Sequence, residues 1–518
     1  MVKKKKSVLA QVWRRGIKFV MVGMCSLVLT GMLPTLSKAF EVEMSEDSKL
    51  NIKTTLNYGI SYRATEPDSF NLRNINGDDG NRNFDEGTLT SNRASISTEV
   101  AYTLKNFLFY TAVYGFYDQA YTQDNDNDSP LTNNNFVGGR TSKHDEFDDD
   151  TREIHGRGVN LRDLYVSGDF RFADRNLMVR VGKQVVTWGE ALATFGSIGN
   201  AMSYADATQV NVPGFELKDV YLPSGQAMMQ MDVIEDFSVA AYYQWEYKKN
   251  VLDAAGSFFS TSDLLDKGGH YFLRGPGQVL YTRVHDDEPD DSGQWGVNLR
   301  YLARALNYTE MNLCYINYHE KFPMFRANPS DGTYRLAYAE DVKLIGASFG
   351  TLIGETNIGG EIAYRQDLPL SVVGGKFKEF DVVQYLLNVY QSYGPFLFID
   401  QTLVLLEGGY NSVMDAENLA ATIDTDACGY LLKFTFKFNN IFPGYDMEVP
   451  VTWKHKVNGM SALTGTWTED QNEIAVGFDF TFDLDLKFGV SYTEFLGDAE
   501  DYAKADRDYV AAYVKYTF

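Results

Sequence analysis

The stretch EIAVGFDFTFDLDLKFGVSYT, residues 473–493, decides the fold. Every second side chain in it is apolar, and the side chains between them are small, polar or charged. The apolar set before the turn at Asp483 is Ile474, Val476, Phe478, Phe480 and Phe482, and the set after it is Leu484, Leu486, Phe488, Val490 and Tyr492. A side-chain period of two predicts two antiparallel strands whose faces meet different solvents.

The same alternation recurs along the chain. The strands expected from it are 50–62, 92–104, 107–118, 159–170, 177–187, 226–234, 237–248, 294–303, 307–318, 339–350, 356–366, 380–390, 398–410, 427–438, 446–456, 472–482, 484–495 and 508–518. Segments 380–390 and 398–410 alternate poorly, so we expect 16–18 strands. At about 10–12 residues most of these strands are longer than usual for a globular sheet and suit a tilted membrane crossing.

The links between these strands alternate between short and long. Lys105-Asn106, Glu235-Asp236 and Asp483 form very short turns. The long links are 63–91, 119–158, 188–225, 249–293, 319–338, 367–379, 411–426, 457–471 and 496–507. Tyrosines also gather at strand ends, as in interfacial girdles. We therefore predict an all-β fold in residues 40–518, a single transmembrane antiparallel β-barrel of the outer-membrane type with short periplasmic turns and long extracellular loops.

Residues 1–39 form an expected signal peptide. They hold eight basic residues and no acidic one, and Phe19 to Leu33 is an uncharged run. Ser37-Lys38-Ala39 fits the small-x-small cleavage rule, which places cleavage before Phe40. An uncleaved anchor is the alternative, but 15 residues are short for a membrane helix. The predicted location is the outer membrane of a Gram-negative bacterium.

The last strand ends in an aromatic residue. Phe518 closes the sequence, and Tyr516 shares its face together with Val514, Ala512 and Val510. This pattern is typical of the strand that the outer-membrane assembly machinery recognises. We expect Phe518 and Tyr516 to be that signal, and we expect contacts with membrane lipid and lipopolysaccharide.

The charge of the chain limits its partners. With 70 acidic and 47 basic residues, the formal net charge is -23, which argues against nucleic-acid binding. The acidic run Asp124, Asp126 and Asp128 departs from a calcium loop, because Ser129 replaces the required Gly and Asn135 the bidentate Glu. Solvated loops or loose calcium or magnesium binding beside lipopolysaccharide both remain open. We expect no defined metal site, no cofactor and no catalysis.

The link 188–225 differs from the others because it is rich in apolar residues and poor in acids. An exposed loop would not normally be so apolar. We expect it to fold into the lumen or to cap it, with Trp188, Phe195, Met202 and Phe215 as candidates for the constriction and for ligand contact. The alternative is a lid packed on neighbouring loops.

Charges of both signs fall on the polar faces of the predicted strands. The lumen candidates are Arg93, Arg162, Arg180, Arg300, Glu361 and Arg365. Structural ion pairs across a wet lumen are one interpretation. A charge-separated constriction that orients a polar solute is the other.

Several motifs carry a family resemblance. Asn76-Gly77-Asp78-Asp79-Gly80-Asn81-Arg82-Asn83-Phe84-Asp85, Gly182-Lys183-Gln184 with Trp188-Gly189-Glu190, and Val212-Pro213-Gly214-Phe215-Glu216-Leu217-Lys218 follow one another. In order and spacing they resemble the family known as domain of unknown function thirteen-oh-two across residues 40–270, although Lys183 stands where the family usually has Arg. The resemblance implies an outer-membrane protein that handles hydrophobic compounds, with a periplasmic lipoprotein-like partner and an inner-membrane exporter. It supplies no catalytic or binding residues.

These observations favour a channel or transporter for hydrophobic or lipid-like compounds. A general diffusion porin for small polar solutes is the first alternative. A non-transport surface protein, an adhesin or a scaffold, is the second.

Overall fold

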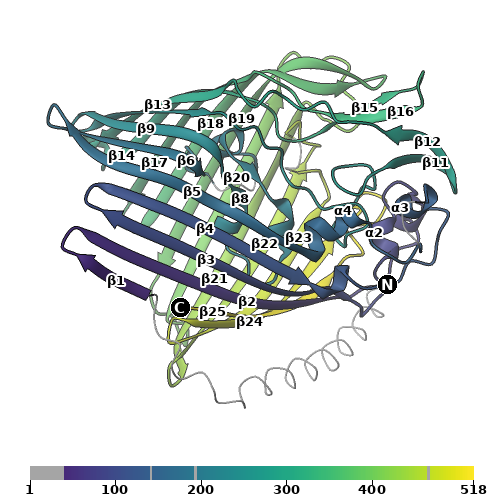
Figure 1. The fold of residues 1–518 in the computed structure, drawn as a ribbon, viewed down its shortest axis with the longest axis horizontal. Coiled ribbons are helices and arrows are strands. Elements are labelled where there is room, and N and C mark those ends of the chain that lie inside the picture. The colour runs from purple at the N-terminus through teal and green to yellow at the C-terminus, as the bar shows by residue number, and fades with distance from the viewer. Residues whose placement is uncertain (1–39, 140–142, 192–194, 464–466) are drawn as a thin grey trace.

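A computed structural model describes residues 40–139, 143–191, 195–463 and 467–518. Eighteen antiparallel strands form one closed barrel (Figure 1). They are β2 (Ser48–Arg63), β3 (Leu89–Leu104), β4 (Phe107–Asp118), β5 (Arg157–Phe172), β6 (Arg175–Gln184), β9 (Ser224–Ile234), β10 (Phe237–Gln244), β13 (Gln294–Ala303), β14 (Thr309–Tyr318), β17 (Val342–Ile353), β18 (Thr356–Val372), β19 (Lys376–Tyr393), β20 (Gln401–Val413), β21 (Asp426–Phe442), β22 (Tyr445–Asn458), β23 (Asn472–Phe482), β24 (Leu486–Leu496) and β25 (Tyr509–Thr517). The predicted fold class is confirmed at the upper strand count.

The barrel closes where β25 pairs with β2, from Thr55 opposite Thr517 to Arg63 opposite Tyr509. The remaining part of this edge of β2 pairs with a short strand that the alternation did not predict, β1 (Phe40–Ser45). β1 and β25 therefore lie in line along one edge of β2. The backbone of Phe518 adds two hydrogen bonds to Thr54, and its ring stacks on Tyr516 with 5.6 Å between centroids.

The two faces of the barrel wall differ, as the period of two requires. Large apolar side chains on the outer face are exposed, among them Leu56, Val113, Leu161, Val181, Met229, Val297, Leu313, Ile345, Ile362, Leu387 and Leu406. The inner face carries buried polar side chains, among them Gln184, Gln226, Gln244, Gln294, Glu361, Arg365, Gln384 and Asn411. An apolar outside and a polar inside are the pattern of a membrane-spanning barrel.

The two ends of the barrel also differ from each other. One end has tight turns, such as Ala173-Asp174, where both residues have positive φ. The other end carries α2 (Asp79–Arg82), α3 (Asn134–Val137), α4 (Asp149–Thr151) and a four-stranded sheet of β11 (Tyr271–Gly275), β12 (Gln278–Arg283), β16 (Thr333–Ala337) and β15 (Met324–Asn328) (Figure 1). Both termini of the barrel, β2 at Ser48 and β25 at Thr517, begin and end at the short-turn end.

One predicted long link is wrong. Residues 367–379 are not a loop, because β18 continues to Val372 and β19 starts at Lys376, and the two remain paired almost to the turn. A register shift between Arg365 and Leu368 breaks the alternation there, which is why the pattern ended too early.

No helix among the described residues is long and apolar enough to span a membrane. The expected signal peptide, residues 1–39, lies outside the described residues.

Candidate functional site

The link between β6 and β9, residues 185–223, crosses the interior of the barrel in its described parts, residues 185–191 and 195–223. It contains α5 (Ile198–Met202), a two-stranded ribbon of β7 (Tyr204–Ala205) and β8 (Tyr221–Leu222), and two short 3-10 turns, Ala207–Asn211 and Leu217–Asp219. Its partners are inward-facing side chains from strands on both sides of the barrel. We call residues 185–223 the lumen loop.

The first half of the lumen loop is attached to the inner wall by apolar packing. Ile198 and Met202 are fully buried in a cluster with residues of β14, β17, β18 and β19. A Cβ atom added at Gly346 of β17 would come within 2.7 Å of the Ile198 side chain, so this wall position leaves room for the loop. Phe195 packs edge-on against Trp467, with ring centroids 5.0 Å apart. This packing fixes the loop against one side of the barrel.

Buried polar groups of the same wall hold the loop backbone. Both carboxylate oxygens of Glu361 in β18 accept backbone N–H bonds, from Ala191 at 2.6 Å and from Ile198 at 3.0 Å. The Arg365 guanidinium donates to the carbonyl of Gly196 at 3.1 Å. The Gln384 amide of β19 donates to the carbonyl of Phe195. These charge-assisted bonds anchor the turn that precedes α5.

The second half of the lumen loop reaches the opposite wall and is held there by charges. Lys515 of β25 lies 3.0 Å from Glu216, and Lys218 lies 2.8 Å from Glu99 of β3. The Arg162 guanidinium of β5 donates to the carbonyl of Asp219 at 2.8 Å. Although burial acts in the opposite direction, the ammonium groups of Lys515 and Lys218 hold the pKa of Glu216 below its ordinary value. The Glu216 carboxylate is therefore ionised at neutral pH.

A small cavity of about 40 Å³ lies between this half of the loop and the wall. Most of its lining residues have polar side chains, and the full set is Thr55, Asn57, Ser95, Ser97, Tyr114, Gln209, Val212, Gly214, Phe215, Glu216, Lys218, Asp219 and Lys515. Phe215 is its largest apolar side chain and is 42% exposed. The loop surface that faces this space thus combines one aromatic ring with charges of both signs.

The four apolar candidates of the loop differ in position. Phe195 and Met202 are buried against the wall, so in this conformation they contact protein. Trp188 is half-buried and packs edge-on against Tyr242 at 5.2 Å. Phe215 is the one of the four that lies exposed beside the cavity. Their roles in a constriction or in ligand contact stay a prediction.

The six lumen charges also divide into two sets. Arg162, Glu361 and Arg365 hold the lumen loop, as described above. The other three lie against the wall itself: Arg93 stacks 3.7 Å over the Phe116 ring, Arg180 lies 5.0 Å from the Tyr165 ring, and Arg300 pairs with Glu310. Sequence alone could place these residues on the inner face but could not separate the two sets.

One catalytic-looking spacing is structural. Gly346-Ala347-Ser348-Phe349-Gly350 has the Gly-x-Ser-x-Gly spacing, but it lies in the middle of β17. A nucleophile elbow requires a sharp turn from a strand into a helix. Ser348 therefore lacks the backbone geometry of such a nucleophile.

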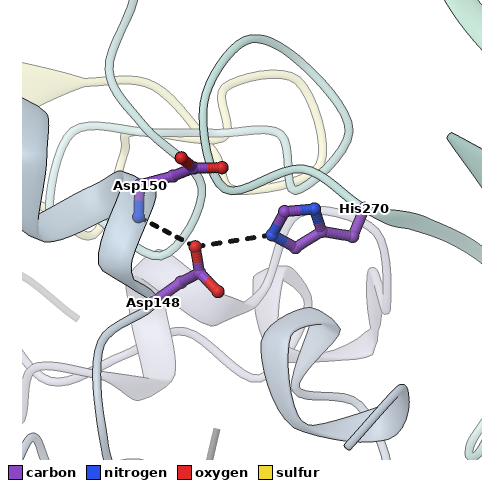
Figure 2. Close-up of side chains that lie close together, drawn as sticks. All are labelled: Asp148, Asp150 and His270. Atoms are coloured by element: carbon purple, nitrogen blue, oxygen red, sulfur yellow. Dashed lines mark hydrogen bonds and ion pairs between the residues drawn. The ribbon is translucent and has the colours of Figure 1, made fainter. Parts of the chain in front are cut away.

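Acidic and histidine side chains meet in the loops outside the barrel. Figure 2 shows Asp148, Asp150 and His270 close together, with His270 Nε2 3.4 Å from Asp148 Oδ1. The same Asp148 oxygen accepts the backbone N–H of Asp150 at 2.9 Å and so caps α4. This contact gives Asp148 a structural role at a helix start.

Comparison with solved structures finds barrels of similar length. The chain is 10% identical to OccAB2 of Acinetobacter baumannii, with a TM-score of 0.44, 90% of this chain and 98% of that chain covered. It is 9% identical to OccAB1 of the same organism, with a TM-score of 0.44 and coverage of 93% and 99%. It is 11% identical to OccK2 (OpdF) of Pseudomonas aeruginosa, solved in complex with glucuronate, with a TM-score of 0.40 and coverage of 90% and 98%.

No functionally curated protein matches the chain. A family model does, and it extends well beyond the motifs in residues 40–270, since it covers residues 20–518. The chain belongs to the family described as Protein of unknown function (DUF1302).

Proposed function

We propose that this protein is an outer-membrane channel for amphipathic compounds, hydrophobic or lipid-like molecules that carry a charged or polar group. The observation that carries the proposal is the lumen loop, which is anchored on both sides of the barrel interior. A barrel of 18 strands is wide enough to leave an aqueous channel, and an inserted segment is what narrows such a channel. The lumen loop is then the constriction.

The class of solute follows from the exposed surface of the loop. Phe215, Val210 and Leu217 are exposed apolar side chains on its second half. The ion pairs of Glu216 and Lys218 lie among them in the sequence and bind the wall nearby. Exposed apolar side chains on a loop segment that also carries charges of both signs suit a molecule with an apolar body and a polar head.

A second candidate is diffusion of small polar solutes. It is favoured by the cavity beside the loop, whose lining is mostly hydroxyl, amide and charged side chains. In this case Phe215 would add nothing to affinity. The two candidates therefore differ in whether an amphiphile dwells in the channel or a sugar simply passes through it.

Planar-bilayer recording of the purified protein tests the proposal. We expect ohmic channels whose current is blocked, reversibly and with saturation, by medium-chain amphiphiles, and we would compare anionic and cationic head groups of equal chain length. Liposome swelling with uncharged sugars gives the comparison for polar solutes. Channels that pass sugars freely and ignore amphiphiles would favour the diffusion porin. A folded protein without conductance would favour an adhesin or scaffold.

A periplasmic lipoprotein-like partner and an inner-membrane exporter are part of the same proposal. They rest on the family resemblance. Co-purification from cross-linked cell envelopes is the direct test.

A further inference from the structure

Three aspartates from two loops meet in the cap above the barrel. Asp78 and Asp79 begin α2 in the link between β2 and β3, and Asp263 lies in the link between β10 and β13. Their exposed fractions are 0%, 1% and 1%. Each offers a carboxylate oxygen, and these three oxygens lie within 4.8 Å of one another. Carboxylates are rarely so completely buried unless something compensates their charge.

The sequence motif around α2 makes this approach possible. A Cβ atom added at Gly77 would lie 2.6 Å from the carbonyl oxygen of Thr261, and one added at Gly80 would lie 2.4 Å from that of Ser257. Glycine at both positions lets the backbone of residues 257–263 pack directly on α2. The N–H of Asp263 then donates to the carbonyl of Asn76 at 2.9 Å. The two glycines bring the third carboxylate up to the first two.

Each of the three carboxylates accepts a hydrogen bond at its Oδ2 atom. Asp78 Oδ2 accepts from Arg82 Nε at 2.6 Å, Asp79 Oδ2 from the N–H of Asn134 at 2.9 Å, and Asp263 Oδ2 from the N–H of Asp79 at 3.4 Å. The Oδ1 atom of each of the three is buried and has no hydrogen-bond partner in the part of the chain that the structure describes. Three buried oxygens, one from each member of the cluster, are thus left for a ligand.

The nearby arginines do not hydrogen-bond to these three Oδ1 atoms. Arg82 binds Asp78 through the other oxygen, as described above. The buried guanidinium of Arg507 donates instead to the carbonyls of Phe258 and Ser260 and to Asn81 Oδ1 at 3.1 Å. Among the described residues, Arg82 is the one cation hydrogen-bonded to any of the three carboxylates.

We propose that Asp78, Asp79 and Asp263 bind a calcium ion through their carboxylate oxygens, and the three unpartnered Oδ1 atoms are available for it. Calcium binds oxygen ligands at about 2.3–2.6 Å, so one ion can bridge oxygens with this spacing. Oxygen ligands alone disfavour the transition metals, which prefer imidazole or thiolate. Magnesium usually keeps several waters and takes one or two carboxylates, and a buried set of three suits it less well.

A further oxygen belongs to the adjoining segment. Asn134, whose N–H binds Asp79, is followed by Asn135, and the buried Asn135 Oδ1 also lacks a hydrogen-bond partner among the described residues. Asn134 and Asn135 belong to α3, in the link between β4 and β5. The ion would therefore join the loops that follow β2 and β10, and the Asn134 N–H bond to Asp79 ties the loop that follows β4 to them.

The site differs from the group in Figure 2. There a histidine takes part, and the Asp148 oxygen that faces it is already engaged. It also differs from the acidic runs that the sequence displays, because it contains only two adjacent acidic residues and one remote one.

Calorimetry on the detergent-purified full chain, stripped with chelator and titrated with calcium chloride, tests the proposal. The test variant is Asp79→Asn/Asp263→Asn, which keeps the side-chain shape and removes two charges. The matched control is Asp149→Asn/Glu153→Gln, two exposed carboxylates of the same cap. Heat-modifiable migration on gels checks that the barrel of each variant is folded.

We expect the parent and the control each to bind one calcium ion. The affinity of the test variant for calcium should be at least 100-fold lower. Calcium should also slow tryptic cleavage of the cap in the parent and the control but not in the test variant. Equal calcium binding by the parent and the test variant would overturn the proposal, and so would a parent that binds no calcium, in which case protons neutralise the cluster. Magnesium that displaces calcium at equal concentration would overturn the assignment to calcium. None of these results depends on conductance, so the site and the channel function are tested separately.

Discussion

The two halves of the lumen loop are attached to the barrel by different forces. Around Phe195, Ile198 and Met202 the loop is fixed by buried apolar side chains and by buried hydrogen bonds to Glu361 and Arg365. Each such apolar side chain is worth about 1.5–3 kcal/mol when removed from water. A hydrogen bond to a charged group adds about 1.5–3 kcal/mol. This half is therefore the permanent anchor of the loop.

The second half is attached more weakly. Lys218 and Glu216 are both between two-fifths and one-half exposed, so water and salt screen their ion pairs. Pairs at such exposure contribute about 0.2–1 kcal/mol each. The apolar residues of the first half therefore fix the loop, and we expect the more weakly attached charged half to be the part that meets a solute.

The largest effect on conductance is expected from removing the anchored first half of the lumen loop. Deletion of residues 195–210 takes out α5 and its apolar contacts, so we expect single-channel conductance to rise several-fold in a planar bilayer and solute selectivity to relax. A deletion of residues 329–332, at the β15–β16 turn outside the barrel, is the control and should leave conductance unchanged. If the folded 195–210 variant conducts like the parent, the loop does not set the constriction.

A single substitution in the residues that hold the first half of the loop should have a smaller effect on conductance. Glu361→Gln removes the charge that accepts the N–H groups of Ala191 and Ile198, at a cost of about 1.5–3 kcal/mol. We expect frequent short-lived openings to a higher conductance level in single-channel traces. The exposed Glu379 of β19 supplies the control variant Glu379→Gln. Traces as quiet as those of the parent would show that apolar packing alone holds this half.

Substitutions on the charged half test whether its lysines affect the ion selectivity of the channel. Lys218→Met/Lys515→Met removes two positive charges beside the cavity. Loss of the partly exposed pair of Lys218 with Glu99 should cost about 0.2–1 kcal/mol, and loss of the buried Lys515 leaves the half-exposed Glu216 to water. We expect a reversal potential in a salt gradient that shifts toward cations, with little change in conductance. Lys376→Met, at an exposed site on β19, should leave the reversal potential where it was. An unshifted double variant would mean that ions avoid this side of the loop.

The smallest effect on conductance is expected from Phe215→Ala. If the ring contacts the apolar body of an amphiphile, its loss should weaken block by about 10-fold or more, as about 1.5–3 kcal/mol of burial implies. Sugar permeation serves as the internal control and should not change. Undiminished block by the same amphiphile would remove Phe215 from the site.

The barrel was predictable because one face of every strand meets lipid and the other meets water. This difference produces the alternation of apolar and polar side chains along each strand, and all 18 expected strands are present. The pattern failed where backbone irregularity interrupts it, at the shift between Arg365 and Leu368, and where strands are only five or six residues long, as in β1, β11 and β15.

The site was only partly predictable. The apolar composition of the lumen loop distinguished it from the other links, but composition does not say whether Phe195 or Phe215 faces the wall. That depends on contacts with strands hundreds of residues away, such as Gln384 with Phe195. The three aspartates of the cap were hidden for the same reason, since Asp263 is 184 residues beyond Asp79 and joins it only through loop packing.

The edge of β2 has a consequence for assembly. Its neighbours there are residues 40–45 and residues 509–517, so the seam is formed by segments at the two extremes of the described chain. Contacts of such large sequence separation require the closure of a very long loop, and this slows folding. Every hairpin between β2 and β25 can form from local pairs, but the seam needs all of them in place. Pairing of β25 with β2 is therefore the slow step that closes the barrel. Until it is complete, the two open edges can pair with another chain.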